Sequence, residues 1–95
     1  MKPPRVDNRE FTDMSLKLKI VSPEKLEFDD YVDSVKVPGV MGNFEILDNH
    51  APIISVLQKG IVEYATKDGK EQLNVSGGFV EVQKNEVSLC VEKTR

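Results

Sequence analysis

The feature that most constrains the fold of this chain is an alternation of apolar and polar residues with a period close to two. Residues 16–20 read Leu-Lys-Leu-Lys-Ile, residues 34–37 read Ser-Val-Lys-Val, and residues 87–91 read Val-Ser-Leu-Cys-Val. Such an alternation gives a β-strand one apolar face, and no stretch of about 11 residues shows the 3.6-residue period of an amphipathic helix. The chain is therefore predicted to be all-β.

Turn-forming residues separate the apolar runs about every 8 to 12 residues. The clearest pair is Asp68-Gly69, for which we expect the two positive φ angles of a type I′ turn between strands near 61–66 and 70–75. The paired glycines Gly77 and Gly78 predict a bend where the chain passes from one sheet to another. Because each strand has only one apolar face, two antiparallel sheets must stack these faces in a small sandwich or flattened barrel.

Length and composition indicate a single globular domain. The chain has 95 residues, of which 39% are hydrophobic and 31% are charged, so it can bury one core. Residues 1–14 contain paired prolines and few apolar side chains, which predicts a flexible N-terminal arm. Residues 15–95 are predicted to form the β-sandwich domain.

Charge and cysteine content exclude several classes of protein. The net charge is −3 and the basic residues are scattered among acidic ones, which makes nucleic acid an unexpected partner. A single cysteine cannot form an intrachain disulfide, and this favours a reducing, cytosolic location. No apolar run approaches the roughly 18 residues of a membrane span, so any membrane association is expected to come through a partner.

The only histidine, His50, is the first candidate for catalysis. A hydrolase would use it as the base, with Ser55 or Cys90 as the nucleophile. No Gly-x-Ser-x-Gly elbow is present, and Ser55 lies in the apolar run "PIISVL", where a strand serine is normally structural. We therefore interpret "DNHAP" as a turn in which Asp48 and Asn49 satisfy backbone groups.

Metal and cofactor sites are not expected either. Structural zinc needs about four ligands, and the chain has one histidine and one cysteine. The glycine-rich stretches "GVMG" and "SGG" lack the lysine and the following helix of a phosphate-binding loop. The sequence thus predicts neither a cofactor nor an enzyme.

The segment "PGVMGNFEIL", residues 38–47, is unusual because two glycines bracket Val40 and Met41. A turn here would carry both apolar side chains to its tip, with Asn43 and Phe44 just beyond. Exposed apolar tips serve contacts with partners more often than chemistry. The alternative, that Met41 and Phe44 fold back onto the edge of the sandwich, is equally compatible with the sequence.

Several motifs together resemble the N-terminal domain of the epsilon subunit of F-type ATP synthase. They are "IVSPEKLEFDD", "PGVMGNFEIL", "NHAP", a glycine at position 60 and "VSGGFVEV", and the resemblance covers Leu16 to Glu92. Members typically have Gly-Ile-Leu-Pro before the Asn-His pair, where this chain has Glu-Ile-Leu-Asp at 45–48. The resemblance implies a ten-stranded β-sandwich of two five-stranded, mostly antiparallel sheets.

The resemblance also implies a function. Members are non-catalytic subunits of the central rotor that bind the gamma subunit and the polar loops of the c-ring, and they help to couple ion-driven ring rotation to ATP synthesis. The implied location is the cytoplasmic face of the bacterial cell membrane, as a peripheral part of the complex. By motif, the implied c-ring contacts are Val40, Met41, Gly42, Asn43 and Phe44, and the implied gamma contacts are His50, Ala51 and Pro52.

Most bacterial members continue into a helical hairpin that can inhibit ATP hydrolysis, whereas this sequence stops at Arg95. The resemblance therefore implies coupling without hairpin-based inhibition, and either a natural short form or a chain cut at the domain boundary fits the ending. The competing class is a free-standing β-sandwich that binds a small ligand. It would need aromatic residues clustered on a concave face, yet the two tyrosines and four phenylalanines are dispersed and there is no tryptophan.

Overall fold

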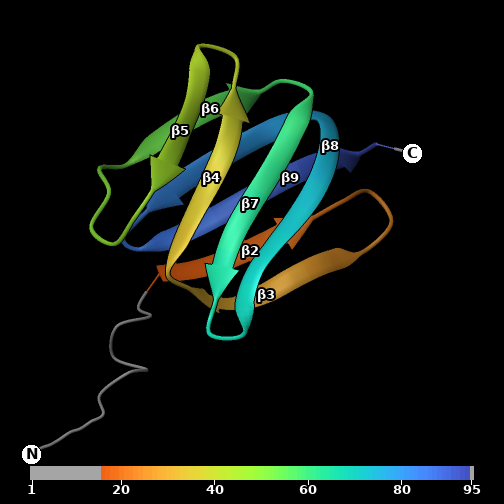
Figure 1. Ribbon diagram of the computed structural model, residues 1–95. Coiled ribbons are helices and arrows are strands. Elements are labelled where there is room, and N and C mark those ends of the chain that lie inside the picture. Colours follow the sequence, from red (N-terminus) through yellow and green to blue (C-terminus); the bar gives the residue numbers. More distant parts are fainter. Residues whose placement is uncertain (1–15, 95) are drawn as a thin grey trace, which may run out of the picture.

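The computed structural model describes residues 16–94, which form eight β-strands (Figure 1). No helix among these residues is long and apolar enough to span a membrane. The strands are β2 (Leu16–Val21), β3 (Leu26–Val32), β4 (Ser34–Gly39), β5 (Gly42–Ile46), β6 (Ile53–Leu57), β7 (Gly60–Thr66), β8 (Gly69–Gln83) and β9 (Glu86–Lys93).

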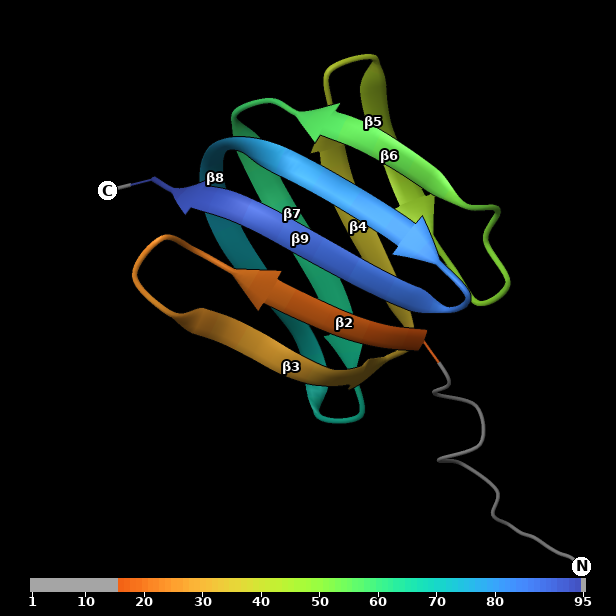
Figure 2. The ribbon, with the colours of Figure 1, turned by 180° about the vertical axis from the view of Figure 1, so that it is seen from behind.

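The strands form one continuous sheet that folds into two crossing layers (Figures 1 and 2). The first layer contains β3, β2, β9, the second half of β8, and β6; the second contains the first half of β8, β7, β4 and β5. All ladders are antiparallel except the one between β2 and β9.

The all-β prediction is confirmed, but the predicted count of ten strands is wrong for the described residues, which form eight. The predicted division into two five-stranded sheets also differs from what is observed. The reason is β8, an unbroken strand of 15 residues. It pairs with β7 along its first half and with β6 and β9 along its second half, so a single strand serves both layers.

The core lies between the two layers and follows the alternation in the sequence. Ile20, Leu89 and Val80 lie side by side across β2, β9 and β8 and are fully buried. Val35 and Val62 of the second layer belong to the same buried cluster. Burial of an aliphatic side chain contributes about 1.5–3 kcal/mol relative to leaving it exposed, so the shared apolar faces hold the layers together.

The bend in β8 is located at the glycine pair. The ladder register shifts between Val75 and Gly77, and Gly78 has a φ of 145°. A Cβ atom at Gly78 would overlap the carbonyl oxygen of Cys90 on β9, so only glycine fits here. The predicted change of layer at Gly77 and Gly78 is confirmed.

The predicted type I′ turn at Asp68-Gly69 is wrong in part. Gly69 has a φ of 125°, but Asp68 is not among the described residues with positive φ. The Thr66 hydroxyl accepts a hydrogen bond from the Asp68 amide at 3.1 Å. This bond stabilises a turn in which Gly69 has a positive φ and Asp68 does not. The pair of positive φ angles typical of a type I′ hairpin occurs instead at Lys84 and Asn85, with φ of 52° and 61°, between β8 and β9.

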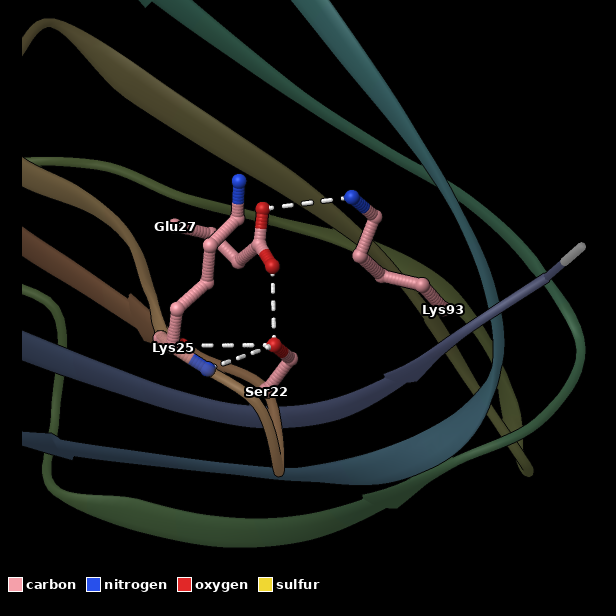
Figure 3. Close-up of polar contacts among 4 residues, drawn as sticks. All are labelled: Ser22, Lys25, Glu27 and Lys93. Atoms are coloured by element: carbon pink, nitrogen blue, oxygen red, sulfur yellow. Dashed lines mark hydrogen bonds and ion pairs between the residues drawn. The ribbon is translucent and has the colours of Figure 1, made fainter.

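A polar cluster ties the turn between β2 and β3 to the end of β9 (Figure 3). The hydroxyl of the buried Ser22 donates to Glu27 Oε2 at 2.8 Å, and Lys93 Nζ lies 3.3 Å from Glu27 Oε1. The amide of Lys25 donates to the Ser22 oxygen at 3.4 Å. The Glu27 side chain is only 10% exposed, so these contacts replace most of its hydration.

This cluster makes part of the stability pH-dependent. The hydrogen bond from Ser22, and after it the contact with Lys93, hold the pKa of Glu27 below its ordinary value of 4.5. The ionised Glu27 carboxylate therefore contributes fully to stability above about pH 4.5. This contribution is lost as the pH falls through the lower pKa that Glu27 has in the folded state. We expect the stability difference between the wild type and Glu27→Gln to shrink on acidification from about pH 6 to about pH 3, as measured by urea unfolding.

The same prediction can be tested at a single group. Because the hydrogen bond from Ser22 and the contact with Lys93 both lower the pKa of Glu27, Ser22→Ala and Lys93→Met should each raise that pKa. Titration of the Glu27 side-chain carbon by NMR measures both shifts. An unchanged pKa in either variant would show that the contact it removes does not stabilise the charged carboxylate.

Candidate functional site

The loop tip, which we define as Val40 and Met41, joins β4 to β5. Gly39 and Gly42 pair directly below it, so the two apolar residues alone form the turn. Met41 is 96% exposed and Val40 is about half exposed. The prediction of an apolar tip is confirmed. The alternative, in which Met41 and Phe44 fold back onto the sandwich, is wrong for Met41 but correct for Phe44, which packs against the core.

The base of the loop tip is packed and hydrogen-bonded. The Phe44 ring is partly buried against the core, and it lies so close to Gly39 that a Cβ there would come within 2.9 Å of it. The Val40 amide donates to the Val56 carbonyl at 3.1 Å, and the Gln58 amide donates to the Pro38 carbonyl at 2.8 Å. These contacts fix the tip to β6 and leave its apolar side chains in solvent.

The His50 turn, which we define as residues 48–52, lies at the other end of β5 (Figure 1). His50 Nδ1 lies 2.8 Å from the Ala51 carbonyl oxygen and can donate to it, and the His50 amide donates to the Leu47 carbonyl at 3.2 Å. The imidazole ring centre is 6.5 Å from that of Phe44. Ala51 and Pro52 are exposed.

Asn85, in the hairpin between β8 and β9, holds the His50 turn in place. Its Oδ1 accepts a hydrogen bond from the Asn49 amide at 2.8 Å, and its Nδ2 donates to Asp48 Oδ1. Asn49 has a φ of 66°, a left-handed conformation that asparagine adopts more readily than most residues other than glycine. The sequence analysis missed Asn85 because nothing local connects it to residues 36 positions away.

We expect Asn85→Gly to loosen the His50 turn. Glycine keeps the positive φ of position 85 but removes both hydrogen bonds, so the free energy of unfolding should fall by about 1–2 kcal/mol. Amide exchange at Asn49 should accelerate more than amide exchange at Thr66, whose turn is closed by its own hydroxyl. Equal acceleration at both amides would mean that the variant destabilises the whole domain and not this turn.

The described geometry gives no support to hydrolytic chemistry. Within residues 16–94, no described hydrogen bond joins His50 to Ser55 or Cys90. The Ser55 hydroxyl instead points to the Val56 carbonyl at 3.5 Å. No group of three His, Cys, Asp or Glu side chains among these residues could hold a metal ion.

Aromatic residues in the described part of the chain do not form an exposed concave cluster. Phe28 and Tyr64 have ring centres 4.6 Å apart, but both are partly buried and pack against the core. Burial raises the pKa of the Tyr64 hydroxyl. This pair therefore serves the packing between β3 and β7.

Comparison with known sequences identifies related proteins. Residues 15–95 match the family described as ATP synthase, Delta/Epsilon chain, beta-sandwich domain. The ATP synthase epsilon chain of Leptospira interrogans serogroup Icterohaemorrhagiae serovar copenhageni is 43% identical over 77 residues, which are 81% of this chain and 61% of the relative. That of Carboxydothermus hydrogenoformans is 43% identical over 72 residues, or 76% of this chain and 54% of the relative. The matches thus span about three fifths or less of these relatives.

Solved structures show the same fold at lower identity. A chain of the Euglena gracilis mitochondrial ATP synthase structure, which contains OSCP, F1 and the c-ring, has a TM-score of 0.75 at 22% identity over 83% of this chain and 51% of that chain. A chain from the central stalk and c-ring structure of the Tetrahymena thermophila mitochondrial enzyme has a TM-score of 0.72 at 16% identity, over 85% and 66%. The chain belongs to the family of ATP synthase Delta/Epsilon chain beta-sandwich domains.

Proposed function

We propose that this chain acts as a non-catalytic subunit in the central stalk of an ATP synthase. In this role it binds the gamma subunit, rests on the polar loops of the c-ring, and helps to couple ion-driven ring rotation to ATP synthesis. The family membership of residues 15–95 carries the proposal, and bacterial relatives more than 40% identical are epsilon chains. The bacterial relatives also support a peripheral position on the cytoplasmic face of the cell membrane, reached through the partners.

The loop tip is the proposed seat on the c-ring. Val40, Met41, Gly42 and Asn43 are exposed, and Phe44 anchors them to the core. Apolar side chains held on a two-residue turn can enter a contact with little loss of backbone freedom, which lowers the cost of binding. A subunit that transmits rotation needs such a rigid contact.

The His50 turn is the proposed contact with gamma, through His50, Ala51 and Pro52. It lies at the opposite end of β5 from the loop tip (Figure 1). One strand thus connects the two proposed contacts, and the hydrogen bonds of Asn85 fix the turn against the β8–β9 hairpin. Force that enters at one end of β5 would be carried through packed strands to the other.

The experiment that tests the proposal is reconstitution. The chain is mixed with an α3β3γ complex of the same source, and with α3β3 alone as the control. Co-elution with α3β3γ but not with α3β3 is expected. The α3β3γ complex should then bind a purified c-ring only when the chain is present. A folded chain that binds neither complex at micromolar concentration would overturn the proposed function.

A further inference from the structure

Strand β3 is the terminal strand on one side of the sheet, and among residues 16–94 it pairs only with β2. Figure 2 shows it at the rim of the first layer. A free strand edge presents backbone amides and carbonyls that can pair with a strand of another chain, and a short edge strand limits this hazard. β3 has seven residues, whereas β5, the terminal strand on the other side, has five. Length therefore protects β3 less than it protects β5.

The Tyr31 amide points toward the free edge of β3. Tyr31 lies opposite Lys17 of β2, but the Lys17 amide donates to the Asn85 carbonyl, on the side of β2 that faces β9. An antiparallel pair that exchanges no hydrogen bonds directs the backbone groups of both residues outward. Two residues further on, the Asp33 amide faces the same way, because it donates to the Ala65 carbonyl of β7 at 2.8 Å.

The carboxylate of Asp30 is bound to this outward amide. Asp30 Oδ1 accepts a hydrogen bond from the Tyr31 amide at 2.8 Å. The amides of Tyr31 and Asp33 are thus both already bonded within the domain. A strand that approaches the edge would have to displace the Asp30 carboxylate before it could pair with Tyr31.

Asp30 also interrupts the apolar face of β3. The ladder places it opposite Leu18, which is fully buried, and its neighbours on the same face of the strand are Phe28 and Val32, which pack in the core. The alternation would place an apolar residue at this position, but the side chain is a carboxylate and is exposed. A charge at an inward-facing position of an edge strand stays hydrated only while no further strand covers it.

A second copy of the chain would find this edge charged. If two β3 strands paired antiparallel about a twofold axis, the acidic centre of one strand, Asp29 and Asp30, would lie against the same residues of the other. Asp29 lies 3.3 Å from Lys17, whereas Asp30 forms no ion pair with another described residue. Like charges opposite one another destabilise a strand pair, and covering an unpaired carboxylate costs its hydration.

We propose that Asp30 keeps the outer edge of β3 closed to strand addition by a second copy of this chain. Its carboxylate occupies the Tyr31 amide and keeps a hydrated charge where a paired strand would exclude water. Asp30 lies outside the loop tip and the His50 turn, so it blocks the edge whether or not those contacts are occupied.

Sedimentation of the full chain tests the proposal with Asp30→Val and a matched control, Asp29→Val. Both variants remove one negative charge from β3 and introduce the same strand-forming side chain, but only Asp30 bonds to the edge amide. At about 200 µM the wild type and Asp29→Val should be monomers, and at least about half of Asp30→Val should be dimeric because its edge is free. A monomeric Asp30→Val, or equal dimerisation of both variants, would overturn the proposal.

Asp30→Thr covers the case in which Asp30→Val precipitates without folding, because threonine favours strands and remains polar. Amide exchange of Tyr31 is measured by NMR at two protein concentrations. In Asp30→Thr it should be about twofold slower at about 200 µM than at about 20 µM, whereas the amide of Ser88, in the interior strand β9, should exchange equally at both. Exchange of Tyr31 that does not depend on concentration in folded Asp30→Thr would contradict the proposal, and so would a wild type that shows the same dependence.

Discussion

Replacing Gly78 with alanine is expected to lower the free energy of unfolding by about 3 kcal/mol or more. Two penalties add at this position. The φ of 145° is strained for any residue with a side chain, which costs about 1–3 kcal/mol. The new Cβ also overlaps the backbone of Cys90 and Val91 on β9, and overpacking against backbone costs about another 1–3 kcal/mol. Urea unfolding at neutral pH measures the sum.

Two other glycines serve as matched controls for Gly78. Gly42 has a φ of 129° but open space around its Cβ position, so Gly42→Ala should show the strain alone, about 1 kcal/mol. A Cβ at Gly77 would make only an ordinary contact, at 3.7 Å from the Leu57 carbonyl oxygen, and Gly77→Ala should change stability by less than about 0.5 kcal/mol. If Gly78→Ala is no worse than Gly42→Ala, the close approach of β8 and β9 is not a constraint.

Met41→Asp is expected to separate stability from binding. The side chain is 96% exposed and supports no part of the core, so the free energy of unfolding should stay within about 0.5 kcal/mol of the wild type. Affinity for a purified c-ring should fall about tenfold, because a charge would enter the centre of a contact from which charges are normally depleted. Surface plasmon resonance with the immobilised chain measures this loss.

Leu26→Asp is the control for Met41→Asp. It introduces the same charge at a half-exposed apolar position on β3, which lies at the opposite end of the strand order from β5, and should leave affinity for the c-ring unchanged. An equal loss in both variants would mean that net charge and not the tip determines binding. Unchanged affinity in Met41→Asp would remove the loop tip from the proposed contact.

The alternation in the sequence predicted the core well because burial on one face of a strand is a local property. Leu16, Leu18 and Ile20 of the first run are buried, and so are the alternating residues Val87, Leu89 and Val91 of the last. The bend at Gly77 and Gly78 could be predicted because the conformational freedom of glycine is also a local property of the sequence. The glycines that bracket Val40 and Met41 predicted the turn, whereas the exposure of Met41 was one of two outcomes that the sequence left open.

Features that depend on pairing between distant segments could not be predicted. The strand count was wrong because the continuity of β8 through both layers depends on which neighbours each half finds. Asn85 was not predicted as a site residue because its contacts with Asp48 and Asn49 form only when the β8–β9 hairpin lies beside the His50 turn. The alignment of Val21, Cys90 and Phe79 across β2, β9 and β8 depends on the register of two ladders, which no local pattern in the sequence specifies.

The parallel ladder between β2 and β9 has a mechanical consequence. It pairs Lys17 with Glu86 at one end and Val21 with Cys90 at the other, so the start of β2 and the end of β9 lie at opposite ends of the ladder. Tension applied between those two points pulls the strands along their own axes in opposite directions. The hydrogen bonds of the ladder then bear the load together instead of opening one after another, and the domain should resist stretching in that direction far better than a hairpin that is unzipped from its ends.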